Sequence, residues 1–267
     1  MKNSLIGNWR QLESKTAENV RLAAELMITQ QLQQMLLPKP PELSQIHGLE
    51  IAGFMEPADE VGGDYYDVLH LNGRVKIGIG DVTGHGLESG MLMLMTQTAV
   101  RTLLEIQETN PVKFLNTLNR VIYDNARRMN CDKNLTLSLL DYCAGRVSIS
   151  GQHEELIVVR SSGAIERIDT VNLGFPLGLE ADITPFINET QIHISSGDVL
   201  VLYTDGVTEA RNSQKQQYGV ERLCRIVQQN RWRSADDIRQ AVVDDVQHHL
   251  SGQKIWDDIT LLVIKQK

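Results

Sequence analysis

The sequence predicts an α+β fold in which two largely antiparallel β-sheets lie face to face and helix pairs cover their outer faces. Three observations support this prediction. Strand-like and helical segments are segregated along the chain rather than alternating, which disfavours a doubly wound parallel sheet. Gly, Asn and Asp turns separate the strand-like segments. Two stacked sheets with helices outside would bury the apolar faces of both kinds of element.

The first predicted element is an amphipathic helix over about residues 18–37. Its apolar side chains recur near a helical period, at Leu22, Leu26, Met27, Met35 and Leu36. The prolines of residues 38–41 end it. We therefore expect an N-terminal helix and linker over 1–41 and the main domain over 42–267. The helix either packs back on its own domain or serves a dimer or an upstream sensor.

Ten strands are expected in the main domain. They cover residues 49–54, 65–71, 75–82, 135–142, 147–150, 156–160, 164–168, 191–194, 199–203 and 259–264. Asn72-Gly73 lies between two of these runs, and both residues tolerate a positive φ, so a tight hairpin is expected there.

Four helices are expected beside these strands. They cover about 87–106, 112–130, 220–230 and 235–250. Pro111 suits the start of the second helix, and Ser234 suits the N-cap of the last one, with Asp237 three residues on. The helices thus come in two pairs, each between blocks of strands.

The composition and net charge of the chain argue against several classes of function. The chain has 267 residues, enough for one large domain with a small appendage, and its 42% hydrophobic content supports an ordinary core. A net charge of −8 argues against nonspecific binding to nucleic acid or to anionic membranes. The apolar windows are far shorter than the roughly 20 residues that span a bilayer. We expect a cytoplasmic protein without a signal peptide, whose three cysteines, Cys131, Cys143 and Cys224, are reduced.

Aspartates stand at the ends of four predicted strands. Asp64 opens one strand, Asp81 closes another, Asp205 follows a third and Asp257 precedes the last. A carboxylate at the rim of an apolar core ionises at a cost unless a cation or hydrogen bonds compensate. Oxygen ligands without nearby His or Cys select Mg²⁺ or Mn²⁺. From the residues alone, a shared cation site and four independent turns are both open.

The motifs around these aspartates carry a family resemblance. They read Val-Gly-Gly-Asp-Tyr-Tyr-Asp at 61–67, Gly-Asp-Val-Thr-Gly-His-Gly at 80–86, Thr-Asp-Gly-Val at 204–207 and Asp-Asp-Ile-Thr at 257–260. In this order they resemble the PPM-type (type 2C) metal-dependent phosphatases, in the bacterial SpoIIE and RsbU branch. The resemblance covers about residues 30–264, and four blocks in order are a specific signal.

The resemblance implies the PPM αββα fold and a site with two divalent cations, Mn²⁺ or Mg²⁺. By position, Asp81 would bridge the two ions and the carbonyl of Val82 would bind one of them. Asp205 and Asp257 would complete the shell of the other ion, and Asp64 would bind the second. Catalysis is expected from these same aspartates.

The chain also departs from the wider family. Asp258 stands where many relatives have Asn, and we place it behind the ligands. Two residues after the bridging aspartate the eukaryotic members have a histidine, whereas this chain has Thr83, with His85 two residues further on. Residues 209–218 resemble the family's flap, which makes them a candidate substrate-contacting loop or else a plain surface loop.

The function implied is a protein serine/threonine phosphatase in which a metal-activated water attacks the phosphate. Its substrate would be a phosphorylated regulatory protein, of the STAS type that antagonises anti-sigma factors in this branch. An upstream sensor or a homodimer would act through the N-terminal helix. The alternatives are a catalytically silent protein that binds a phosphorylated partner, and a two-metal hydrolase of small phosphoesters.

Overall fold

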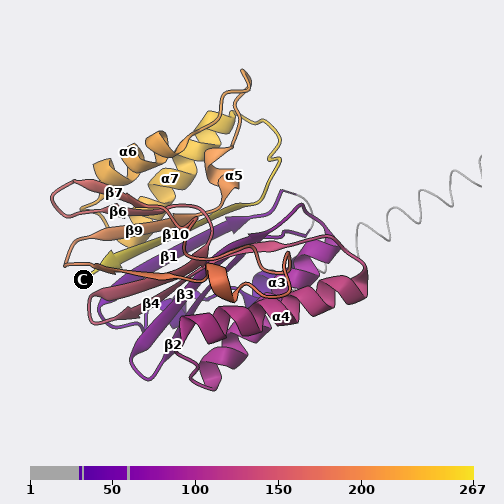
Figure 1. The fold of residues 1–267 in the computed structure, drawn as a ribbon. Coiled ribbons are helices and arrows are strands. Elements are labelled where there is room, and N and C mark those ends of the chain that lie inside the picture. The colour runs from indigo at the N-terminus through magenta and orange to yellow at the C-terminus, as the bar shows by residue number, and fades with distance from the viewer. Residues whose placement is uncertain (1–29, 32, 59–60) are drawn as a thin grey trace, which may run out of the picture.

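The computed structural model describes residues 30–31, 33–58 and 61–267. Within them, ten strands form two five-stranded sheets whose pairings are all antiparallel (Figure 1). One sheet has the order β1 (Leu49–Glu56), β10 (Ile259–Gln266), β9 (Val199–Tyr203), β6 (Leu156–Val159) and β7 (Ile165–Ile168). The other has the order β2 (Tyr65–Leu71), β3 (Arg74–Val82), β4 (Leu135–Cys143), β5 (Arg146–Gln152) and β8 (Glu189–His193).

Helix pairs cover the outer faces of both sheets, as predicted. Helices α3 (Leu87–Glu105) and α4 (Pro111–Met129) lie against the sheet that contains β2 and β3 (Figure 1). Helices α6 (Val220–Asn230) and α7 (Ala235–Leu250) lie against the sheet that contains β9 and β10. The α+β, two-sheet prediction is therefore confirmed.

Three single-turn elements were not predicted. They are α2 (Pro40–Leu43), α5 (Asp205–Thr208) and a 3₁₀ turn over Thr184–Phe186. A segment of three or four residues is too short for a helical period to show in the sequence. The helix predicted over 18–37 lies largely outside the described residues, of which 30, 31 and 33–36 are helical. The division at residue 41 stays a prediction.

The central strands are buried on both faces. In β9, Val199, Val201 and Tyr203 face helices α6 and α7, while Leu200 and Leu202 face the other sheet. Because both faces are apolar, this strand reads as a continuous hydrophobic run instead of an alternating one. Such strands place their ends, and the polar residues that follow, at a fixed edge of the sandwich.

Several local signals operate as predicted. Asn72 and Gly73 adopt φ angles of 51° and 79° in the hairpin between β2 and β3. The Ser234 side chain accepts a hydrogen bond from the backbone N–H of Asp237 at the start of α7.

All three cysteines are free thiols. In the described part of the chain, no helix combines the length and the apolarity that crossing a membrane requires.

Candidate functional site

The four predicted aspartates come from both sheets. Asp64 directly precedes β2 and Asp81 is the penultimate residue of β3. Tyr65 pairs with Gly80 in the antiparallel register, so the next step along each strand sets Asp64 opposite Asp81. This pair belongs to the sheet that α3 and α4 cover.

The other two aspartates belong to the second sheet. Asp205 begins α5 two residues after the end of β9, and Asp257 lies two residues before β10. The backbone N–H of Thr204 donates to the carbonyl of Thr260 at 3.1 Å, which extends the β9–β10 ladder to this edge. The two loops approach so closely that a Cβ on Gly206 would lie 2.0 Å from the Asp258 carbonyl oxygen. Glycine is therefore required there.

Three of these carboxylates have raised pKa values, and neighbouring carboxylates contribute to each shift. Burial, together with the charges of Asp205, Asp257 and Asp258, raises the pKa of Asp81 to about 8. Burial also raises the pKa of Asp205, with Asp257 as its main charged neighbour. Burial raises the pKa of Asp257 too. Like charges at one edge oppose ionisation, and a cation would relieve this opposition.

Asp64 is the most buried member, with 1% of its surface exposed. Burial raises its pKa well above the ordinary value, and the charges of Asp81 and Asp258 add to the effect. The hydroxyls of Thr204 and Thr260 donate to Asp64 Oδ2 at 2.8 and 2.5 Å. Asp64 Oδ1 is buried and has no hydrogen-bond partner among the described residues. A buried carboxylate oxygen of this kind calls for a ligand.

The loop before Asp64 is shaped around the same edge. A Cβ on Gly63 would lie 2.7 Å from the carbonyl oxygen of Val82 and 3.3 Å from Asp81 Oδ1. The missing side chain thus keeps space beside two of the predicted ligand atoms. The carboxylate of Asp258 accepts hydrogen bonds from the backbone N–H groups of Gly63 at 2.6 Å and Ala58 at 2.8 Å. It holds the loop, in line with its predicted place behind the ligands.

A residue from the N-terminal segment also holds this loop. The Gln33 side chain is buried, at 4% exposure. Its Nε2 donates to the carbonyl of Gly62 at 2.9 Å, and the N–H of Gly62 donates to its Oε1 at 3.3 Å. The pair of bonds links the segment before the domain to the loop that carries Asp64.

The donor chemistry fits a divalent cation. The predicted side-chain ligands are all carboxylates, one buried carboxylate oxygen lacks a partner among the described residues, and Gly63 leaves room beside the Val82 carbonyl. Within residues 30–31, 33–58 and 61–267, however, no group of three His, Cys, Asp or Glu side chains is arranged to hold a metal ion. The assignment of Asp64, Asp81, Val82, Asp205 and Asp257 as ligands therefore stays a prediction.

Sequence reasoning assigned no role to three residues that organise this site. Thr204 and Thr260 stand inside two of the motifs, and their position beside the aspartates was a usable signal. Gln33 carried no such signal, because its partner is a backbone amide 29 residues away. Only the tertiary structure reveals that contact.

Comparison with known proteins gives a family, and the relatives that match include two proteins of known name. The model of the family described as Stage II sporulation protein E (SpoIIE) matches residues 72–267. The chain is 28% identical to Protein IcfG of Synechocystis sp., over 98% of this chain and 45% of IcfG. It is 25% identical to phosphoserine phosphatase RsbU of Bacillus subtilis, over 92% of this chain and 71% of RsbU. The chain therefore spans less than half the length of IcfG.

A solved structure shares the fold. The SiaA-PP2C domain of Pseudomonas aeruginosa superposes with a TM-score of 0.81 over 94% of this chain and 99% of that domain. Sequence identity between the two is 16%, so the likeness concerns the fold alone. The αββα architecture predicted from the motifs is the one this domain has.

Proposed function

The chain belongs to the SpoIIE family of PP2C-type phosphatases, and from this premise we propose that it is a metal-dependent protein serine/threonine phosphatase. Its substrate would be a phosphoserine or phosphothreonine on a regulatory protein. The name of the relative RsbU, a phosphoserine phosphatase, supports this substrate chemistry.

One observation carries the proposal. Burial and neighbouring carboxylates raise the pKa of four aspartates at the ends of strands in both sheets, and the most buried of them keeps an oxygen without a partner among the described residues. A fold does not retain such mutual repulsion for stability, because each uncompensated carboxylate opposes folding at neutral pH. Two divalent cations, Mn²⁺ or Mg²⁺, would offset it.

The residues of the site would have two roles, to hold the cations and to position the ligands. Asp64, Asp81, Asp205, Asp257 and the Val82 carbonyl would hold the cations. When bound, the cations would lower the pKa of a water molecule and offset charge on the phosphoryl group. The remaining groups position these ligands: two threonine hydroxyls fix one oxygen of Asp64, and the Asp258 carboxylate holds the preceding loop.

We assign two further features to this function. The phosphorylated partner would be a STAS-type protein, in keeping with the SpoIIE and RsbU branch. The segment 1–41 would couple an upstream sensor or a second copy of the chain to the site. Its contact through Gln33 supports a direct route to the loop that carries Asp64.

The test is phosphate release from a phosphorylated STAS-domain protein and from p-nitrophenyl phosphate, with and without Mn²⁺. We expect Mn²⁺-dependent turnover that falls at least about a hundredfold in Asp81→Asn. Asp124→Asn, on the exposed face of α4, is the matched control and should retain turnover. Equal turnover in wild type and Asp81→Asn would reject the metal mechanism. Hydrolysis of p-nitrophenyl phosphate but not of the phosphorylated STAS-domain protein would favour the alternative, a hydrolase of small phosphoesters.

A further inference from the structure

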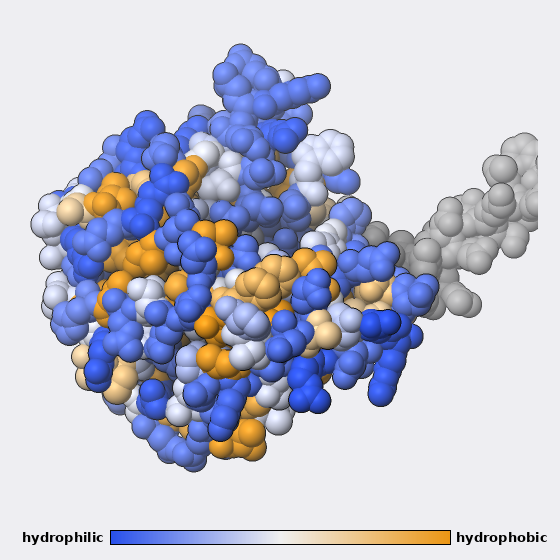
Figure 2. Space-filling view, viewed as in Figure 1, coloured by the Kyte–Doolittle hydropathy of each residue, from blue (hydrophilic) through white to orange (hydrophobic). Residues whose placement is uncertain are grey.

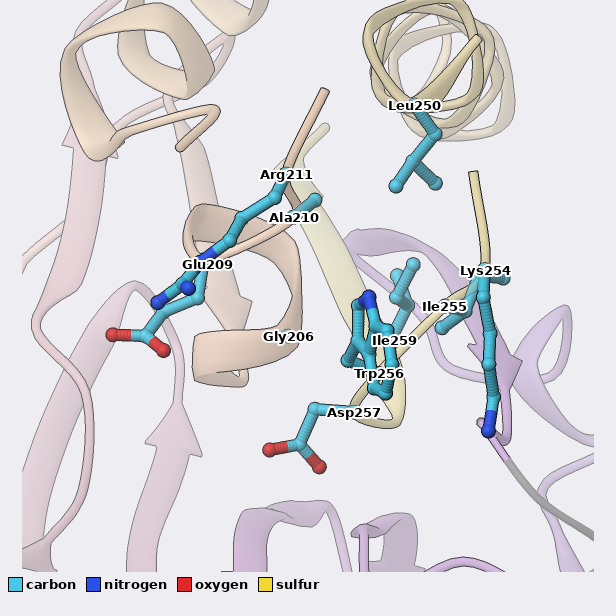
Figure 3. Close-up of a pocket in the computed structure, with 10 residues that line it drawn as sticks. All are labelled: Gly206, Glu209, Ala210, Arg211, Leu250, Lys254, Ile255, Trp256, Asp257 and Ile259. Carbon is cyan, nitrogen blue, oxygen red and sulfur yellow. The ribbon is translucent and has the colours of Figure 1, made fainter. Parts of the chain in front are cut away.

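A pocket of about 340 Å³ opens beside Asp257, one of the four aspartates (Figure 3). We propose that it receives an apolar side chain, of the size of Leu or Phe, that flanks the phosphorylated residue of the protein substrate. The inference rests on the proposed function, since it places the phosphorylated residue at the aspartates. It would make the pocket, and Trp256 at its rim, determinants of substrate specificity.

The inner part of the pocket is apolar. Ala210, Leu250 and Ile259 line it, with 8%, 5% and 5% of their surfaces exposed. Figure 3 shows Leu250 pointing from α7 toward Trp256 and Ile259, so that the end of α7 closes one side. Charged residues, Glu209, Arg211, Lys254 and Asp257, also line the pocket, but a charged group placed against the three buried apolar side chains would lose its hydration there. An apolar side chain fits this interior.

The rim is exposed and carries a large aromatic residue. Trp256 is 72% exposed, and the Lys254 ammonium lies 5.2 Å from the centroid of its ring. Tryptophan is among the residues that contribute most at protein interfaces, because its large rigid surface is buried at little entropic cost. Its neighbour Asp257 lines the same pocket, so this rim joins the pocket to the predicted metal ligands.

The opposite wall is held in place before any substrate arrives. It belongs to the loop after α5, which Figure 2 shows as a hydrophilic projection at the top of the molecule. Arg211 and Gln217 form a β-bridge within this loop. The buried Tyr218 donates from its hydroxyl to Asp245 Oδ2 of α7 at 2.8 Å. A preformed wall lowers the entropy lost on binding.

The pocket adjoins the two loops that carry Asp205 and Asp257. Gly206 lines the pocket and directly follows Asp205, while Asp257 belongs to both places. An extended peptide advances about 3.3 Å per residue. A side chain one to three positions from the phosphorylated residue therefore reaches the pocket while the phosphate lies at the aspartates.

The experiment uses alanine-based phosphoserine peptides in which a single Leu, Phe or Asp is scanned over the three positions on either side of the phosphoserine. Kinetics of Mn²⁺-dependent phosphate release give kcat/KM for each peptide. We expect Leu or Phe at one position to raise kcat/KM about tenfold or more over Ala, the discrimination that an apolar pocket provides. Asp at that position should give no increase.

A matched pair of tryptophan variants assigns the preference to the pocket. Trp256→Ala should remove the preference for Leu or Phe. Trp232 is 68% exposed and lies under the Arg231 guanidinium, 5.3 Å from its ring centroid, so it resembles Trp256 in exposure and contact but lies outside the pocket. Trp232→Ala should keep the preference.

The outcomes separate the two proposals. If p-nitrophenyl phosphate and the peptides are hydrolysed without preference at any position, or if Trp256→Ala keeps the preference, the pocket proposal is wrong and the phosphatase stands. If nothing is hydrolysed, the proposed function fails. The pocket is then judged by fluorescence anisotropy with labelled forms of the same peptides. Binding of the Leu or Phe peptide at least tenfold tighter than the Ala peptide, lost in Trp256→Ala, would support it, and equal binding would overturn it.

Discussion

Replacing Asp81 with Asn should stabilise the cation-free protein at alkaline pH. Burial and three neighbouring carboxylates raise the pKa of Asp81 to about 8 in the folded protein, from an ordinary value of 3.8. A raised pKa means that the folded state binds the proton more tightly than the unfolded state. This contribution to stability is present below about pH 4 and is lost as the pH rises through about 8. Asn keeps the shape and never ionises.

The magnitude follows from the same two values. The gap between a pKa of 3.8 and one of about 8 corresponds to roughly 6 kcal/mol in the free energy of unfolding, at about 1.4 kcal/mol per pKa unit. Asp81 is partly accessible to solvent, which screens the neighbouring charges, so this is an upper limit. We expect the free energy of unfolding of Asp81→Asn to exceed that of wild type by about 2–4 kcal/mol near pH 8.5 and by almost nothing near pH 4.

Urea denaturation in EDTA at both pH values measures the difference. Asp198→Asn is the control with the opposite sign, because Asp198 is buried among donors. It accepts from the N–H groups of Ser161 at 2.8 Å and Ser195 at 3.0 Å and pairs with Arg160 at 2.9 Å, and its pKa is lowered. That variant should lose about 1–3 kcal/mol at neutral pH.

Two results would refute this reasoning. One is an Asp81→Asn protein that is less stable than wild type near pH 8.5 in EDTA. The other is a difference between the two proteins that does not change with pH. Added Mn²⁺ should reverse the order, because a cation that binds only the folded wild type stabilises it by mass action.

Two substitutions test how the loop before Asp64 is held. Gly63→Ala would place a Cβ 2.7 Å from a backbone carbonyl oxygen, so we expect Mn²⁺ affinity, measured by titration calorimetry, to fall about tenfold or more; unchanged affinity would contradict this. Gln33→Ala removes two hydrogen bonds to buried backbone groups and should lower the free energy of unfolding by about 1–3 kcal/mol and reduce turnover. Gln34 is exposed, so Gln34→Ala should change neither the free energy of unfolding nor turnover. Equal decreases in both variants would show that the hydrogen bonds between Gln33 and Gly62 have no special role.

The fold was largely predictable because its local signals agree with one another. Each of the ten expected strands is present, and the hairpin at Asn72-Gly73 and the cap at Ser234 lie where turn and capping chemistry place them. The pairing of the strands was not predictable from these signals. β6 pairs with β9, and β1 pairs with β10 across about 200 residues, because the partner of a strand depends on packing between segments that are far apart in the chain.

The candidate site was also only partly predictable from the sequence. The positions of Asp64, Asp81, Asp205 and Asp257 at strand ends could be predicted from the sequence, because apolar runs begin or end there and a glycine adjoins the first three of them. The threonine hydroxyls on Asp64 were not assigned, although both lie in the motifs. Single-turn α5 and the Gln33 contact left no periodic or compositional signal at all.

The sequence by itself determined the element order, the two-layered core and the residue types that gather at the edge of the sandwich, because periodicity and turn chemistry are local properties of the chain. The tertiary structure decided which oxygen of Asp64 is held, how far the pKa of Asp81 rises and where the pocket beside Trp256 opens. These depend on distances between segments far apart in the chain, and those distances exist only once both sheets are stacked.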